Sequence, residues 1–205
     1  MSAAKDEILA RVRAALGPAP AVPEIPRAYH GAGALGAEGI VDRFCERVAE
    51  YRATVHRVAQ AEVAATVRGI VGDGRVGVPA GFDDLGLAVI EDDGLSVSDL
   101  DALDAVVTGS ALAIADTGTI VLDSGPRSGR RALTLVPDHH VCIVEADAIV
   151  PSVPDAIAAL AEAAAEGRPI TFVSGPSATS DIELDRVEGV HGPRVLDVVV
   201  AVKRA

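Results

Sequence analysis

Two segments near the middle of the chain combine threonine or serine with glycine, and each follows a short apolar run that is typical of a strand. Their residues are Thr108, Gly109 and Ser110 in the first segment, and Asp116, Thr117, Gly118 and Thr119 in the second. Glycine lets backbone N–H groups approach a ligand, and flanking hydroxyls add donors that suit a small carboxylate or phosphate. Asp116 could orient a ligand hydroxyl or act as a general base. Because tight hairpin turns need the same residue types, a structural role explains the pattern equally well.

A third polar segment follows the apolar run 170–173. Its candidate site residues are Gly175, Ser177 and Thr179, then the carboxylates of Asp181 and Glu183, and further on the imidazole of His191. Ligands of open α/β sheets gather at the carboxyl ends of strands, so a site is expected here. In extended chain Asp181 and Glu183 share a face, and His191 could serve as an acid, a base or a metal ligand. The alternatives are charges at a helix N-terminus for the two carboxylates and a hydrogen-bonding turn for the histidine.

Three arginines, Arg127, Arg130 and Arg131, stand within five positions of one another. A guanidinium group binds carboxylates and phosphates through two parallel hydrogen bonds, so such a cluster could hold a small anion. A solvated loop in an acidic protein would also accept these residues. We therefore carry Arg127 forward as a candidate substrate-binding residue, with the solvated loop as the alternative.

The side chains that commonly bind metals do not form a recognisable ligand set. His139 and His140 are adjacent on a predicted strand and so point to opposite faces. The spacing of Asp181, Glu183 and His191 matches no standard zinc site. The two cysteines, Cys45 and Cys142, are far apart and too few for an iron–sulfur cluster, which normally takes four thiolates. We expect no metal and no cofactor in this chain.

Composition excludes several classes of function. The 205 residues carry a formal net charge of -12, which disfavours nucleic acids and anionic membranes as partners. Three phenylalanines, two tyrosines and no tryptophan leave little for stacking on bases. Charges interrupt every apolar stretch at the amino terminus, and no run of about 18 apolar residues occurs, so we expect no signal peptide and no membrane span. The expected location is the cytoplasm.

The first 28 residues differ in pattern from the rest of the chain. Apolar residues at positions 8, 9, 12 and 16 have helical spacing, which predicts a helix over residues 6–16 that ends at Gly17 and Pro18. Prolines at positions 18, 20, 23 and 26 then predict an extended linker. We therefore expect a helix and linker over residues 1–28 and one α/β domain over residues 29–205.

Short apolar runs alternate with helical patterns through that second part. The predicted helices are 37–51, 60–68, 95–103 and 152–167, and the predicted strands are 54–58, 75–78, 87–90, 104–107, 110–115, 119–122, 140–144, 170–173 and 195–202. Ser98 with Asp101 and Ser152 with Asp155 are the expected N-terminal caps of the last two helices. Such alternation is typical of a parallel sheet, while the short connections between residues 104 and 122 favour hairpins. The expected fold is an α/β domain with a parallel-centred mixed sheet and flanking helices.

Three ordered motifs resemble the LUD-domain family of lactate utilisation proteins, lactate utilisation protein C type. They are TGSALAIADTGTIVLDS at 108–124, LVPDHHVCIVEADAIV at 135–150, and FVSGPSATSDIE with GVHGP between 172 and 193. The resemblance implies a fold like that of the ribose-phosphate isomerase, glucosamine-phosphate deaminase and CoA-transferase group. It also implies a cytosolic complex that oxidises L-lactate to pyruvate, in which iron–sulfur clusters reside in partner subunits.

Three functions follow as hypotheses. In the first, this chain is a subunit of the lactate-oxidising complex and helps to bind the small anionic hydroxy acid. In the second, it is a stand-alone enzyme of the same fold that acts on a phosphosugar, a folate or a CoA thioester. In the third, it is a non-catalytic scaffold whose first helix holds a partner. Whether the chain is an enzyme by itself stays open at this point.

Overall fold

The computed structural model describes residues 3–17, 23–26, 36–175 and 192–203. The chain divides into two compact units, Met1–His30 and Gly31–Ala205. The first unit contains helix α1 (Ala3–Leu16), where the helical spacing predicts a helix over residues 6–16. Among the described residues, no helix is both long and apolar enough to cross a membrane.

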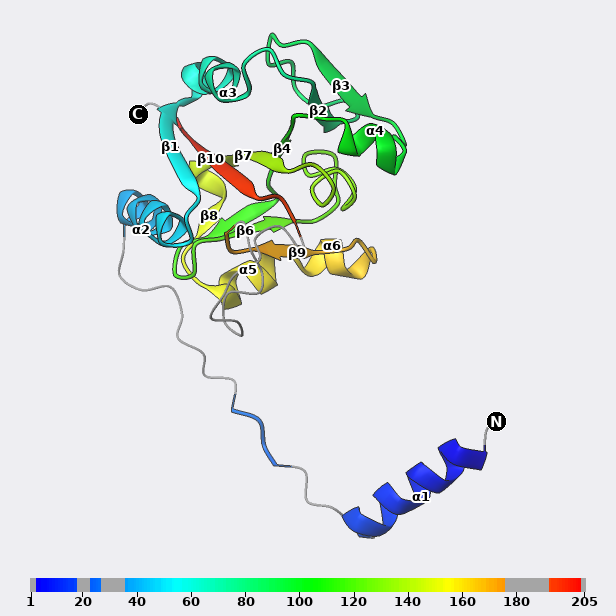
Figure 1. The fold of residues 1–205 in the computed structure, drawn as a ribbon. Coiled ribbons are helices and arrows are strands. Elements are labelled where there is room, and N and C mark those ends of the chain that lie inside the picture. The colour runs from blue at the N-terminus through cyan, green and yellow to red at the C-terminus, as the bar shows by residue number, and fades with distance from the viewer. Residues whose placement is uncertain (1–2, 18–22, 27–35, 176–191, 204–205) are drawn as a thin grey trace. The chain divides into compact units, whose positions relative to one another are not determined.

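The second unit alternates strands and helices (Figure 1). Its helices are α2 (Ala37–Glu50), α3 (Val63–Val71), α4 (Val97–Asp101), α5 (Val153–Ala159) and α6 (Ala161–Ala165). Its strands are β1 (Thr54–Ala59), β2 (Val76–Pro79), β3 (Val89–Asp92), β4 (Ala105–Gly109), β5 (Leu112–Ile114), β6 (Thr119–Leu122), β7 (His139–Glu145), β8 (Ile149–Val150), β9 (Thr171–Val173) and β10 (Val195–Val202). Single 3₁₀ turns occupy Gln60–Glu62 and Ala146–Ala148.

Six strands form a fully parallel sheet in the order β1-β10-β7-β4-β2-β3. The central strands β4, β7 and β10 are buried along most of their length, as expected for a parallel sheet that is covered on both faces. Figure 1 shows β10, in red, running between β1 and β7. The expected α/β fold with a parallel centre is confirmed.

A separate four-stranded sheet holds the antiparallel pairs that the short connections predict. Its order is β8-β5-β6-β9, with β5 and β6 forming a hairpin and β9 antiparallel to β6. The sequence suggested one mixed sheet, whereas the structure has two sheets. The division falls at Ser110, where the chain leaves β4 in the parallel sheet and enters β5 in the smaller one.

The layers follow from the apolar faces. One face of the parallel sheet packs on α3 through Val63 and Val67, and the opposite face packs on both α2 and the smaller sheet. The outer face of the smaller sheet is covered by α5 through Ala156 and Leu160. Leu100 of α4 and Leu133 form a further apolar cluster with Val106 of β4. The helices α2 to α5 of this unit thus cover sheet faces with apolar side chains.

Two helix predictions need correction. The N-cap of α4 is Ser96, whose side chain accepts a hydrogen bond from the Asp99 amide, and the predicted pair of Ser98 with Asp101 is wrong. Both pairs have the same spacing, so the sequence motif alone could not distinguish them. The predicted helix 152–167 is divided at Leu160 into α5 and α6. Ser152 is the N-cap residue as predicted, but its hydroxyl bonds the Asp155 carboxylate instead of a backbone amide.

Candidate functional site at the carboxyl ends of β2 and β4

Strands β2 and β4 are neighbours from which the chain departs in opposite directions. After β2 it continues to β3 at one edge of the parallel sheet, and after β4 it passes through the smaller sheet to β7 on the other side. Such a reversal is a topological switch point of the sheet. Open α/β sheets bind their ligands at this point.

The loop of residues 123–131, here called the arginine loop, lies against both strand ends. The amide of Gly109 in β4 donates a 2.9 Å hydrogen bond to the carbonyl oxygen of Arg127. A Cβ added to Gly129 would stand 3.2 Å from the Pro79 ring, which ends β2. In the same loop Ser124 has a φ of 54°, a conformation that costs a non-glycine residue about 1–2 kcal/mol. Strained backbone of this kind is concentrated at functional sites.

Arg127 lies directly over the end of β4. A Cβ at Gly109 would meet Nε of Arg127 at 2.6 Å, so only glycine lets the guanidinium lie here. Nη2 of Arg127 donates a 3.1 Å hydrogen bond to Oε1 of Glu145, the last residue of β7. The Arg127 side chain is 44% exposed. Within the described residues this is the one hydrogen bond that its guanidinium makes, which leaves most of its five N–H groups available to an anion.

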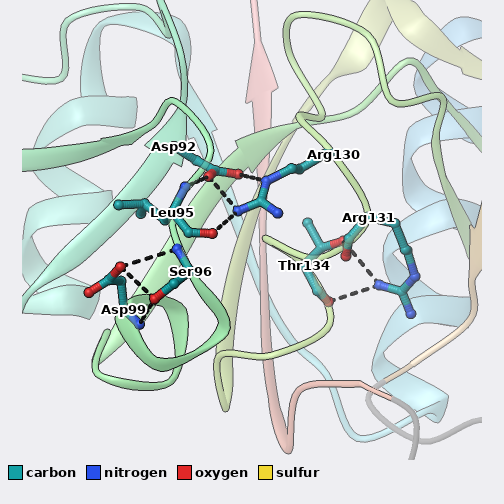
Figure 2. Close-up of polar contacts among 7 residues, drawn as sticks. All are labelled: Asp92, Leu95, Ser96, Asp99, Arg130, Arg131 and Thr134. Carbon is teal, nitrogen blue, oxygen red and sulfur yellow. Dashed lines mark hydrogen bonds and ion pairs between the residues drawn. The ribbon is translucent and has the colours of Figure 1, made fainter.

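The other two arginines of the cluster serve the fold. Figure 2 shows Arg130 donating two 2.7 Å hydrogen bonds to Asp92 and a third to the Leu95 carbonyl. The Asp92 side chain is only 1% exposed, so this bidentate pair neutralises a buried charge. Arg131 bonds the carbonyl and hydroxyl of Thr134, away from Arg130 (Figure 2). The three guanidinium groups therefore do not converge on one anion.

Thr108 and Ser110 flank Gly109 and are both buried. Oγ1 of Thr108 lies 2.8 Å from Nε2 of His140, inside the parallel sheet. Burial lowers the pKa of His140 to about 3, so the imidazole is neutral at physiological pH. Burial also raises the pKa of the neighbouring Cys142 thiol to about 12, which makes it unreactive. Among the described side chains, the Ser110 hydroxyl is the one buried polar group without a hydrogen-bond partner.

The residues of the second predicted segment, 116–119, form the turn between β5 and β6, here called the hydroxyl turn. The hydroxyls of Thr117 and Thr119 lie 2.7 Å apart, and Thr119 is 2.8 Å from the Ser174 hydroxyl that follows β9. Asp116 accepts a 3.1 Å hydrogen bond from Arg43 of α2. A Cβ on Gly118 would stand 2.7 Å from backbone and side-chain carbon of Arg47, so the turn lies directly on α2.

The hydroxyl turn and the end of β4 lie apart. Ser110 and Asp116 stand beyond opposite ends of β5, whose three residues span about 10 Å of extended chain. Of the third predicted segment, Gly175 lies at the hydroxyl turn's end of the smaller sheet, close to Tyr51. Ser177, Thr179, Asp181, Glu183 and His191 lie outside the described residues. The predicted site residues that the structure describes thus fall into two groups, one of Thr108, Gly109, Ser110 and Arg127, and the other of residues 116–119 with Gly175.

A third polar cluster was missed by the sequence reasoning. Asp197 of β10 is hydrogen-bonded through Oδ1 to His56 of β1 and through Oδ2 to His139 of β7, each at 2.7 Å. Burial alone would raise the pKa of Asp197, but the hydrogen bonds and charges of the two imidazoles lower it. His56 and His139 stand on the strands either side of β10. Both reach Asp197 only because β1 and β7 pair with β10, and no local sequence pattern encodes that strand pairing. Among the described residues, no three His, Cys, Asp or Glu side chains are grouped to hold a metal ion.

Comparison with known proteins gives the family. The model of the LUD domain family matches residues 90–201. A protein named lactate utilization protein C from Deinococcus radiodurans is 43% identical over 203 residues, which is 96% of this chain and 95% of that relative. This chain belongs to the LUD domain family. A lactate utilization protein C from Bacillus licheniformis is 41% identical over 91 residues, which is 42% of this chain and 38% of that relative.

A solved member of the LUD family has the same fold. It is the crystal structure of a DUF162 family protein from Deinococcus radiodurans, with a TM-score of 0.72 and 41% sequence identity over 82% of this chain and 99% of that one. The LUD match contains β4, the arginine loop and all of β7, and hence both Arg127 and Glu145.

Proposed function

We propose that this protein takes part in lactate utilisation and that it binds the hydroxy acid at the carboxyl end of β4. The observation that carries the lactate assignment is the 43% identity to a lactate utilization protein C over nearly the full length of both chains. The geometry at the carboxyl end of β4 supports the binding role. Arg127 supplies a half-exposed guanidinium with unused donors, and the topology of the sheet brings it to the place where open α/β folds hold ligands.

The chemistry of lactate fits these groups. Its carboxylate would pair with Arg127, since charge-assisted hydrogen bonds from a guanidinium are the strongest that a protein offers such a group. The buried Ser110 hydroxyl remains a predicted contact, one that a ligand would reach only after a shift of the chain around it. The hydroxyl turn lies at the far end of β5, so Asp116 and its neighbours would not touch the same small molecule. Asp181, Glu183 and His191 remain predicted residues of the site.

Oxidation of lactate to pyruvate releases two electrons and two protons, and the electrons need an acceptor. The chain has two cysteines, fewer than an iron–sulfur cluster takes. The electrons would therefore pass to iron–sulfur clusters in partner subunits of a cytoplasmic complex. Affinity purification from lactate-grown cells should recover cysteine-rich iron–sulfur proteins together with this chain. Recovery of this chain by itself would contradict the complex.

Replacement of Arg127 tests the binding role directly. Because Arg127→Gln removes the charge that holds the carboxylate, we expect L-lactate to bind at least about tenfold more weakly in isothermal titration calorimetry. Arg43→Gln is the matched control, since Arg43 is 42% exposed and pairs with a single carboxylate at the opposite end of β5. Equal losses in the two variants, or no loss in Arg127→Gln, would contradict the proposal.

A further inference from the structure

The partner of Arg127 is itself a carboxylate, and it bears on which anions the site accepts. We infer that Glu145 occupies, in the free protein, the position that an acid's carboxylate takes on Arg127, and that its charge makes the site select monocarboxylates over phosphate and other dianions. This inference rests on the proposed function, because it assigns a selectivity to the same site.

The hydrogen bond between Arg127 and Glu145 is of a kind that an incoming carboxylate can replace. It consists of one 3.1 Å hydrogen bond, and the Glu145 side chain is 21% exposed. The pair of Arg130 and Asp92 in the same region has two 2.7 Å hydrogen bonds and a nearly inaccessible carboxylate. Partly exposed pairs with a single contact contribute little to stability, so an incoming carboxylate can replace Glu145 on the guanidinium at small cost.

Glu145 stays near the bound anion after that anion has displaced it from Arg127. It ends β7, which runs beside β4, and its register places it two residues beyond Ile143, the partner of Gly109. A displaced Glu145 therefore still faces the bound anion. Two nearby cations are already paired with other carboxylates, Arg168 with Asp123 of the arginine loop and Lys203, which interacts electrostatically with Glu145, with Asp147.

The charge of the ligand then determines how well it binds beside Glu145. A monocarboxylate replaces one negative charge on Arg127 with another and repels Glu145 once. For a dianion the attraction to Arg127 and the repulsion from Glu145 both double, since the Coulomb energy is proportional to the product of the charges, so beside Glu145 the second charge brings no net gain. Because a dianion also costs more to desolvate than a monoanion, lactate and pyruvate would bind in preference to a phosphate dianion.

The test measures L-lactate and inorganic phosphate binding to the full chain at pH 8, by calorimetry, in wild type and Glu145→Gln. The substitution removes the charge and retains the shape of the side chain. We expect phosphate affinity to rise by about tenfold and lactate affinity by about threefold, so that the selectivity for lactate falls. Glu145→Asp, which keeps the charge, should retain the wild-type selectivity. Glu50→Gln, on the exposed pair of Glu50 with Arg47, should change neither affinity.

The outcomes separate this inference from the proposed function. If lactate binding depends on Arg127 but Glu145→Gln leaves the ratio of lactate to phosphate affinity unchanged, the selectivity role of Glu145 is refuted and the binding site stands. If Glu145→Gln gains phosphate binding while no variant binds lactate, the role of Glu145 in excluding dianions is supported and lactate is the wrong ligand. If neither anion binds to wild type or to Glu145→Gln, both are overturned.

Discussion

Arg127 and Arg130 leave the same loop and differ in what their guanidinium groups contact. Arg130 has its donors taken by Asp92 and by the carbonyl of Leu95 (Figure 2), while Arg127 makes a single hydrogen bond to Glu145. The cluster of arginines could be found in the sequence. Its division into one ligand-binding candidate and two structural residues could not, because Asp92 is 38 positions from Arg130 and β3 and the loop meet only in the fold.

The different partners of Arg130 and Arg127 predict different losses of stability for their substitution by glutamine. Arg130→Gln leaves the Asp92 carboxylate buried without its cation, and we expect it to lower the free energy of unfolding by about 3 kcal/mol. Arg127→Gln should lower it by less than about 1 kcal/mol, because its pair is half-exposed. Urea denaturation at pH 7 measures both values. An equal loss in the two variants would show that Arg127 is also a structural residue.

The loss of unfolding free energy in Arg130→Gln should depend on pH in a definite direction. Burial by itself would raise the pKa of Asp92, but the hydrogen bonds from Arg130 and the Leu95 amide, with the charge of Arg130, lower it below its usual value. A lowered carboxyl pKa contributes stability above the pKa of the unfolded chain, about 3.9, and that contribution is lost as the pH falls through the folded value. The difference between wild type and Arg130→Gln should therefore diminish below about pH 4.

At the scale of elements, the alternation of apolar runs and helical patterns was enough to predict the α/β class. The final strand is an example, since Val195–Val202 has seven apolar residues, mostly β-branched, in a run whose length suits a strand buried on both faces. The division into two sheets could not be predicted, because Thr108 and Gly109 look like turn residues and in fact complete β4. The hydroxyl turn was recognised from its composition, but its contact with α2 depends on tertiary packing.

The contact of the hydroxyl turn with α2 predicts that Gly118→Ala and Gly167→Ala lower the unfolding free energy by different amounts. Gly118 has a φ of 60°, and an added Cβ would stand 2.7 Å from atoms of Arg47, so Gly118→Ala should cost about 3 kcal/mol of unfolding free energy. Gly167 has a φ of 72° with no atom within 4 Å of the added Cβ, so Gly167→Ala should cost about 1 kcal/mol. Denaturant titration of both variants compares the costs. Similar values would mean that the turn does not lie tightly on α2.

At the scale of the whole molecule, the parallel sheet and the smaller sheet hold two groups of polar residues at opposite ends of β5. Ser110 and Asp116 belong to the two segments of threonine or serine with glycine, which are close together in the sequence. In the structure β5 separates them, so the two segments lie beyond opposite ends of that strand. The chain's topology favours the end at β2 and β4, where the proposed hydroxy acid would meet Arg127.

The most direct test of this account is to follow backbone amide resonances by NMR while L-lactate is added to the full chain. We expect the resonance of the Gly109 amide, next to Arg127, to shift in a saturable manner and that of the Gly118 amide in the hydroxyl turn to stay unchanged. A saturable shift of Gly118 with Gly109 unchanged would place the ligand at the other end of β5 and contradict the assignment.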